Sequence, residues 1–402
     1  MFYCQHVLGI GHLVRSAEIA AALATRFDVR FVSGGTPVEN FPFAPGVEVV
    51  QLPPLETGED FDGLRSTDGV SVERTKDLRK AQLLALFGEW RPDVLIVELF
   101  PFGRKSFSFE LMPLLQAASA KEGGTKVVCS LRDLLVRREN PAEHEERVCR
   151  IVNAHFDLIL VHGDPRLFTL ADSFGRVRDI APPIRYTGYV AQKSTDARTE
   201  AEPFIVVSAG SGRCESGCRL IEAAIQGAGD GALRHCRFHV FAGPLVRDED
   251  YARFAELAEG RDNVVLERYT PHLQELMRSA ELSVSMAGYN TLMNILSTGV
   301  RALVYPFTGN EDTEQTTRAM RLEELGLIGV LPPETPEPAG LAARMKFMLG
   351  TRPAPVSLDL AGAENTLNYL LEAIGELPAA PGRETSRAQR NPRLFSPLSG
   401  AV

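Results

Sequence analysis

Residues 285–291 read Ser285-Met286-Ala287-Gly288-Tyr289-Asn290-Thr291 and follow an apolar run that is typical of a buried strand. We expect the strand to end at Ser285, the chain to turn at Gly288 and a helix to begin at Thr291. Such a turn directs free backbone N–H groups and a helix N-terminus at one point, where phosphate binds readily. The stretch therefore predicts a diphosphate pocket at the end of a strand.

A second polar group follows the next expected strand, at residues 302–305. Glu314 and Gln315 come after that strand. We expect them at the same edge of a parallel sheet, where open α/β folds bind their ligands. One side of the predicted site would hold phosphate, and the other would hold a polyhydroxyl compound.

Short apolar runs alternate with amphipathic segments, which predicts an α/β fold with doubly wound parallel sheets. In the first half, strands are expected near 2–8, 28–33, 47–51, 93–97, 125–130 and 157–162, and helices near 13–25, 72–90, 106–121, 142–154 and 165–173. In the second half, strands are expected near 204–208, 237–242, 263–267, 282–285, 302–305 and 327–331. We expect Rossmann-like domains at 1–190 and 204–356, a linker at 191–203, a final helix within 357–376 and a disordered tail at 377–402.

Two further glycine turns complete a pattern of three motifs. Gly9-Ile10-Gly11-His12-Leu13-Val14-Arg15-Ser16 stands near the N-terminus, and Val206-Val207-Ser208-Ala209-Gly210-Ser211-Gly212 follows the expected linker. With residues 285–291, these motifs resemble the GT-B glycosyltransferases, and among them family 28, the group of the lipid II-forming N-acetylglucosaminyltransferases. The resemblance implies two Rossmann-like domains that face a central cleft, with the acceptor on the first and the nucleotide sugar on the second. It also implies that the final helix returns to the first domain.

The resemblance further implies inverting transfer of a sugar from a nucleoside-diphosphate sugar, with uridine as the expected nucleoside, to a hydroxyl of a small-molecule or lipid-linked acceptor. The glycine turns would hold the diphosphate, Tyr269 would flank the nucleobase, and Glu314 with Gln315 would bind the sugar hydroxyls. Ordinary tight turns, a core tyrosine and a charged helix face are the structural alternatives. The implied donor-binding residues are Gly11, Gly210, Ser211, Gly212, Tyr269, Gly288, Tyr289, Asn290, Thr291, Asn294, Glu314 and Gln315.

His12 is the expected general base, because it follows a Gly-x-Gly turn at the start of a helix. A helix N-terminus disfavours imidazolium, so the ring stays neutral and can take a proton from an acceptor hydroxyl. Asp133 is the rival catalytic residue and would act as the base itself or orient His12. Glu98 has a similar position and a weaker claim. The structural alternatives are a histidine that packs its helix and an aspartate that caps one.

Two positions depart from the family 28 pattern. Asn294 stands where the pattern has a glutamate that accepts hydrogen bonds from the ribose hydroxyls, and Gln192 stands where an arginine is expected. An amide accepts less strongly than a carboxylate, and its N–H groups must also be satisfied. The choice between UDP and dTDP therefore stays open.

Two other classes of protein fit the same motifs. The Gly-x-Gly-His-x-x-Arg string also resembles a nucleotide-sugar hydrolase of nonulosonic acid synthesis, in which water replaces the acceptor. A non-catalytic sugar-nucleotide-binding partner is the third possibility.

The composition is that of an ordinary globular enzyme, with 402 residues, 44% hydrophobic and 24% charged. No apolar run reaches the ~18 residues of a membrane span. The N-terminus lacks the pattern of a signal peptide, so a cytoplasmic location is expected. The net charge of −9 argues against nucleic acid as a partner.

No cofactor and no metal are expected. The six cysteines form neither a disulfide framework nor paired zinc motifs, and Cys214 and Cys218 stand without a second pair. The two Asp-x-Asp strings, at 60–62 and 248–250, are the chance matches that an acidic chain produces. Residues 100–109 are rich in phenylalanine and include Arg104 and Lys105. They fit an aromatic or lipidic acceptor with an anionic group, with contact to a membrane surface, and they fit buried packing equally well.

Overall fold

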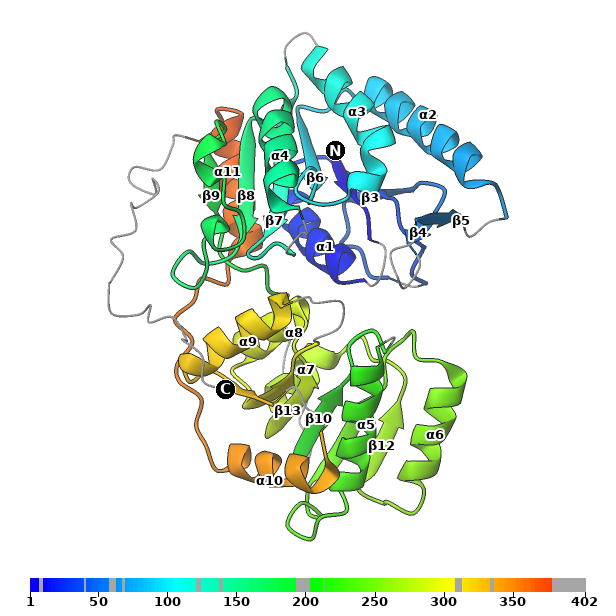
Figure 1. The fold of residues 1–402 in the computed structure, drawn as a ribbon, viewed down its shortest axis with the longest axis vertical. Coiled ribbons are helices and arrows are strands. Elements are labelled where there is room, and N and C mark those ends of the chain that lie inside the picture. The colour runs from blue at the N-terminus through cyan, green and yellow to red at the C-terminus, as the bar shows by residue number, and fades with distance from the viewer. Residues whose placement is uncertain are drawn as a thin grey trace.

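Two parallel sheets flanked by helices lie one above the other in the computed structural model (Figure 1). The first sheet has seven strands in the order β3-β2-β1-β6-β7-β8-β9, and the second has six in the order β12-β11-β10-β13-β14-β15. The predicted α/β fold with two Rossmann-like domains is confirmed. The structure describes residues 1–6, 10–39, 41–57, 63–66, 69–120, 124–136, 140–192, 203–212, 214–307, 313–332 and 336–377.

The first domain follows the predicted alternation closely. Its strands are β1 (Phe2–Cys4), β2 (Val29–Ser33), β3 (Val47–Gln51), β6 (Val94–Glu98), β7 (Lys126–Arg132), β8 (Leu158–His162) and β9 (Ile184–Tyr186). Its helices are α1 (Gly11–Leu23), α2 (Val72–Trp90), α3 (Ser108–Ala120) and α4 (Pro141–His155). A small hairpin, β4 (Leu55–Thr57) with β5 (Leu64–Ser66), was not expected.

The prediction of a helix at 165–173 is wrong. This segment forms a short 3₁₀ turn, Leu170–Asp172. The Asp172 carboxylate accepts hydrogen bonds from the backbone and hydroxyl of Thr169, and the Asp164 carboxylate accepts one from the backbone N–H of Arg166. Such local bonds from side chains to the backbone compete with helix formation.

The second domain has strands β10 (Phe204–Ser208), β11 (Arg237–Phe241), β12 (Val264–Glu267), β13 (Leu282–Met286), β14 (Ala302–Tyr305) and β15 (Gly329–Val330). Its helices are α5 (Glu215–Gly227), α6 (Asp248–Ala258), α7 (Leu273–Ser279), α8 (Tyr289–Thr298), α9 (Glu314–Glu324) and α10 (Pro338–Leu349). Strands β10 and β13 are buried along their whole length, as expected for parallel strands covered on both faces.

After α10 the chain runs back to the first domain and forms α11 (Gly362–Ala373) there, coloured orange in Figure 1. Tyr369 and Leu370 share a hydrophobic core with Leu13 of α1. The first residue of α11 must be glycine, because a Cβ on Gly362 would lie 2.6 Å from the carbonyl oxygen of Gly188. The linker expected at 191–203 and the tail at 377–402 lie almost wholly outside the described residues.

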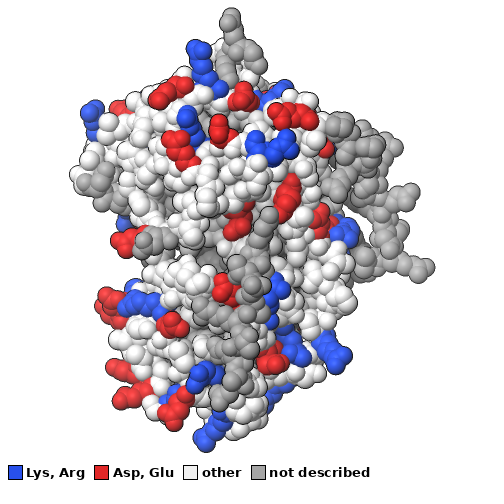
Figure 2. Space-filling view, turned by 180° about the vertical axis from the view of Figure 1, so that it is seen from behind, with Lys and Arg blue, Asp and Glu red and all other residues white. Residues whose placement is uncertain are grey.

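Two further observations bear on the predicted environment. No helix in the described part of the chain is long and apolar enough to cross a membrane. Basic and acidic side chains are interspersed over the described part of the face shown in Figure 2. That face therefore offers no segregated charge for an anionic membrane or nucleic acid.

Candidate functional site

The two glycine turns of the second domain leave its sheet side by side. Strands β10 and β13 are neighbours, with Ser208 opposite Ser285, so both turns begin at the same level. Gly210 and Gly212 have positive φ angles of 68° and 82°. A Cβ on Gly212 would lie 2.5 Å from the carbonyl oxygen of Ala242, so the turn requires glycine.

Gly288 caps the N-terminus of α8, which begins at Tyr289, two residues before the predicted start. Gly210 is exposed, while Ser211, Gly288 and Thr291 are partly exposed. The geometry suits a diphosphate, and binding of one stays a prediction.

The third motif meets this pair across the interface between the domains. The side-chain amide of Asn290 donates to the carbonyl oxygen of Gly11 over 3.0 Å. The Tyr289 hydroxyl donates to the carbonyl oxygen of His162 over 3.0 Å and accepts from the Val190 backbone N–H over 3.3 Å. Gly11, Tyr289 and Asn290 thus lie where the two domains touch. Tyr289 is buried there, and its predicted contact with the donor is untested.

His12 is held by a carboxylate at the end of β6. Its Nδ1 lies 2.6 Å from Oε1 of Glu98, and Nη2 of Arg15 lies 2.5 Å from the same oxygen. Burial alone would raise the pKa of Glu98, but the nearby His12, Arg15 and Arg104 bring it down to about 2. Because an ionised carboxylate only accepts hydrogen bonds, Nδ1 carries the proton and Nε2 has the lone pair. Among the described residues, Nε2 has no hydrogen-bond partner.

The imidazole is neutral at pH 7. Burial lowers the pKa of His12 to about 3, against the opposing pull of the Glu98 carboxylate. Desolvation, rather than the helix N-terminus, is thus the main cause. The side chain nevertheless keeps 18% of its surface exposed, so the ring is largely buried but reachable from solvent.

Asp133 does not orient His12, which corrects one prediction. Its carboxylate accepts from Nε of Arg318 at 2.8 Å, from Nη2 of Arg318 at 2.6 Å and from the Tyr189 hydroxyl at 3.1 Å. The reason is topological, since β6 lies next to β1 while β7, which precedes Asp133, is one strand further away. Burial raises the pKa of Asp133, but the Arg318 guanidinium outweighs it and holds that pKa below its usual range. A carboxylate engaged in this way is a poor base.

Glu314 belongs to the same group of charges. One oxygen accepts from Nη2 of Arg318 at 2.7 Å, and the other lies 2.9 Å from Nη2 of Arg132. We call Arg132, Asp133, Glu314 and Arg318 the interdomain ion cluster. Two of its members come from each domain. In this arrangement both oxygens of Glu314 are engaged, so its predicted contact with sugar hydroxyls requires the cluster to rearrange.

Three other predicted donor residues have distinct surroundings. Gln315 accepts from the Phe307 backbone N–H over 3.1 Å. Asn294 is buried in α8, where its amide donates to Oε1 of Gln192 over 3.2 Å while its own Oδ1 is buried without a partner. The two departures from the family pattern therefore contact each other. Tyr269 is 52% exposed just beyond β12, which excludes the core alternative.

No described group of three or more histidine, cysteine or acidic side chains could hold a metal ion. In the string at 248–250, Asp248 pairs with Arg268, and Asp250 pairs with Arg247 and Arg253. The string at 60–62 lies outside the described residues. All six cysteines are free thiols. Metal independence remains a prediction.

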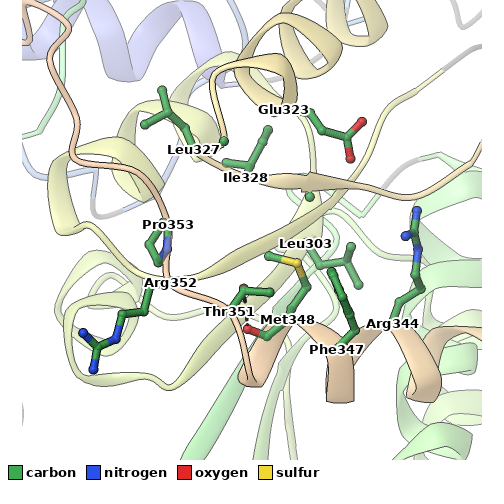
Figure 3. A pocket seen from close by; sticks show the side chains of 12 residues that line it. Leu303, Glu323, Leu327, Ile328, Arg344, Phe347, Met348, Thr351, Arg352 and Pro353 are labelled. Carbon is green, nitrogen blue, oxygen red and sulfur yellow. Dashed lines mark hydrogen bonds between the residues drawn. The ribbon is translucent and has the colours of Figure 1, made fainter.

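A separate cavity of about 230 Å³ lies near the amino-terminal ends of β14 and β15, between Leu303, Ile328 and the end of α10 (Figure 3). The predicted site is at the carboxyl ends of the strands. None of the residues that line this cavity was predicted to bind a substrate.

Comparison with known proteins agrees with this architecture. Residues 204–355 match the family model of the glycosyltransferase family 28 C-terminal domain. The protein is a glycosyltransferase of the GT-B fold, and its second domain is similar to the C-terminal domain of family 28. The predicted fold and enzyme class are thus confirmed. A comparison with curated proteins finds no match by sequence.

Solved structures share the whole two-domain fold. The calicheamicin glycosyltransferase CalG4 is 16% identical, with a TM-score of 0.55 over 93% of this chain and 94% of that chain. MurG of Acinetobacter baumannii is 13% identical, with a TM-score of 0.54 over 94% and 99%. Phytolacca americana UGT2, complexed with UDP-2fluoro-glucose and pterostilbene, is 14% identical, with a TM-score of 0.56 over 93% and 94%. At these identities the likeness shows the fold.

Several residues of the candidate site were missed from the sequence. Arg318 could have been found, because it lies one helical turn after Glu314, where side chains of opposite charge meet. Arg132 directly precedes Asp133, which was singled out. His162 and Tyr189 carried no local signal, since their contacts come from segments far apart in the sequence.

Proposed function

We propose that the protein transfers a sugar, with inversion and without a metal, from a UDP-linked sugar to a hydroxyl of a small-molecule or lipid-linked acceptor. One observation carries the proposal. Glu98 fixes the proton of His12 on Nδ1, and Nε2 is left with a lone pair and no protein partner at the interface of the two domains.

In the proposed step, the acceptor oxygen attacks C1 of the sugar while its proton moves to Nε2 of His12. The bond between C1 and the phosphate oxygen breaks, and its electron pair leaves with the diphosphate. The imidazolium that forms is stabilised by the ionised Glu98 at 2.6 Å from Nδ1. A bound diphosphate would also favour the protonated ring, which raises the low pKa of His12 towards the working pH.

The second domain would stabilise the leaving group. Glycine turns at 210–212 and 288 present backbone N–H groups next to the N-terminus of α8, and these act on a developing phosphate charge as a metal does elsewhere. Tyr269 offers an exposed ring for the nucleobase. We assign the unpartnered Oδ1 of Asn294 as the hydrogen-bond acceptor for the ribose hydroxyls. The proposed location of the protein is the cytoplasm.

The proposal is tested by incubating the purified protein with UDP-sugars and dTDP-sugars, with and without candidate hydroxyl acceptors, in EDTA. We expect release of UDP that depends on an acceptor. Release at the same rate without an acceptor would instead identify a hydrolase. Binding of UDP without turnover under any condition would identify a non-catalytic partner.

A further inference from the structure

Arg104 lies just after β6, beside the His12–Glu98 pair, and has no ion pair or hydrogen bond to any described residue. Its Nε and Nη2 are both buried without a partner. The residue has a positive φ of 57°, a conformation that is uncommon for a side chain of this kind. The chain therefore holds a guanidinium in the site without satisfying it.

The charges around Arg104 do not balance. Glu98, whose charge acts on Arg104, is paired with Arg15 and His12 through Oε1 and has no hydrogen-bond partner on Oε2; the interdomain ion cluster is neutral, with two arginines and two carboxylates. His12 is neutral at pH 7. Among the described residues, Arg15 and Arg104 thus share the single negative charge of Glu98, which leaves one positive charge in excess. Nε of Arg132, in the cluster, is a further buried donor without a partner.

Arg104 and Arg132 both lie close enough to His12 to influence its charge. Both are among the positive charges that lower the pKa of His12, and Arg132 also lowers the pKa of Arg104 after the larger effect of burial. A small cavity of about 30 Å³ is lined by Arg132, by Gly103, which precedes Arg104, and by apolar side chains that include Leu99 and Phe102. Arg132 therefore borders a largely apolar space, and Arg104 comes directly after one of the residues that line it.

We propose that Arg104 and Arg132 bind an anionic group, a carboxylate or phosphate, of the acceptor whose hydroxyl reaches His12. Both arginines belong to the first domain, whereas the turns suited to the donor diphosphate belong to the second. Burying an unpaired charge is costly, and an anion would satisfy the free N–H groups with charge-assisted hydrogen bonds. That the bound anion belongs to the acceptor rests on the proposed sugar transfer, but the anion site itself can be tested without that transfer.

The test is a calorimetric titration of inorganic phosphate at constant ionic strength, with and without saturating UDP. We expect wild-type protein to bind phosphate in both conditions with a Kd below roughly 10 mM. Arg104→Gln should weaken phosphate at least ~10-fold and leave UDP affinity unchanged. Arg74→Gln, at an exposed position of α2, is the matched control and should change neither.

Each outcome decides the proposal. It is overturned if wild-type protein does not bind phosphate, if UDP displaces phosphate, or if Arg104→Gln weakens UDP instead. Phosphate binding through Arg104 without UDP binding would uphold the anion site and refute the proposed transfer. Binding to vesicles of phosphatidylcholine with phosphatidic acid shows whether the phosphate group is carried by a lipid or by a free compound. Binding that Arg104→Gln weakens points to a lipid-borne phosphate, and phosphate binding without vesicle binding points to a free acceptor.

Discussion

Replacing Arg318 by methionine should strongly destabilise the fold. The buried guanidinium makes three charge-assisted hydrogen bonds, two to Asp133 and one to Glu314, and so joins the two domains. Methionine fills much of the same volume but leaves Asp133 as a buried carboxylate without its ion-pair partner, while the charge of Arg132, which pairs with Glu314, still acts on it. Removing one partner of a buried ion pair costs about 3–5 kcal/mol, and we expect a loss in this range at pH 7.

The loss of stability caused by Arg318→Met should become smaller as the pH falls. In wild-type protein the pKa of Asp133 lies below its ordinary value because of Arg318, despite the opposing effect of burial. Without Arg318, burial raises that pKa, so the folded variant takes up a proton at a higher pH than the unfolded chain does. Protonation removes the buried charge, and the gap between variant and wild type therefore narrows from pH 7 towards pH 5.

Urea denaturation followed by circular dichroism measures both effects. Arg321→Met is the matched control on the same helix, because Arg321 forms a partly exposed pair with Glu324 and should cost no more than about 1 kcal/mol. If Arg318→Met costs no more than Arg321→Met, or if its effect does not change with pH, the interdomain ion cluster does not hold the domains together as argued.

Three further changes test the site. Glu98→Gln removes the carboxylate that fixes the tautomer of the base, and should lower single-turnover rates by roughly 10²-fold or more with UDP affinity unchanged; a few-fold loss would count against the pairing. Burial lowers the pKa of His162 in the folded protein to about 3. On acidification the unfolded chain therefore takes up a proton at His162 at a higher pH than the folded protein does, and the free energy of unfolding should fall as the pH drops from 6.5 towards 3. In thermal melts His162→Gln should make that decline shallower, while the exposed His272→Gln should not. Tyr269→Ala should weaken UDP binding by about 1–3 kcal/mol if the ring stacks on the base, whereas Phe347→Ala, at a ring that is 65% exposed on α10, should leave it unchanged in calorimetry.

The sheets could be predicted from the sequence because buried parallel strands leave a clear local pattern. Apolar runs such as residues 204–208 and 302–305 match their strands to the residue. The segment at 165–173 failed because side-chain hydrogen bonds from Thr169 and Asp172, which apolar periodicity does not reveal, set its conformation.

The site was predictable where it depends on turns and strand ends. Open α/β sheets bind their ligands at the carboxyl ends of the parallel strands, and this rule correctly predicted that His12 and the glycine turns lie at the sheet edges where the two domains meet. Side-chain pairing was not predictable, because it depends on the order of strands in the sheet. Glu98 rather than Asp133 reaches His12 since β6 is the neighbour of β1. The interdomain ion cluster depends on the contact between the domains, for which a single chain offers no periodic signal.

The most direct test of the account is the single-turnover rate of His12→Ala, measured together with its UDP affinity. If His12 is the base, the rate should fall by roughly 10²- to 10⁴-fold, while UDP affinity stays close to that of the parent because the donor turns lie in the second domain. Circular dichroism would confirm that the variant is folded. A folded His12→Ala protein that turns over within a few-fold of the parent would contradict the central claim.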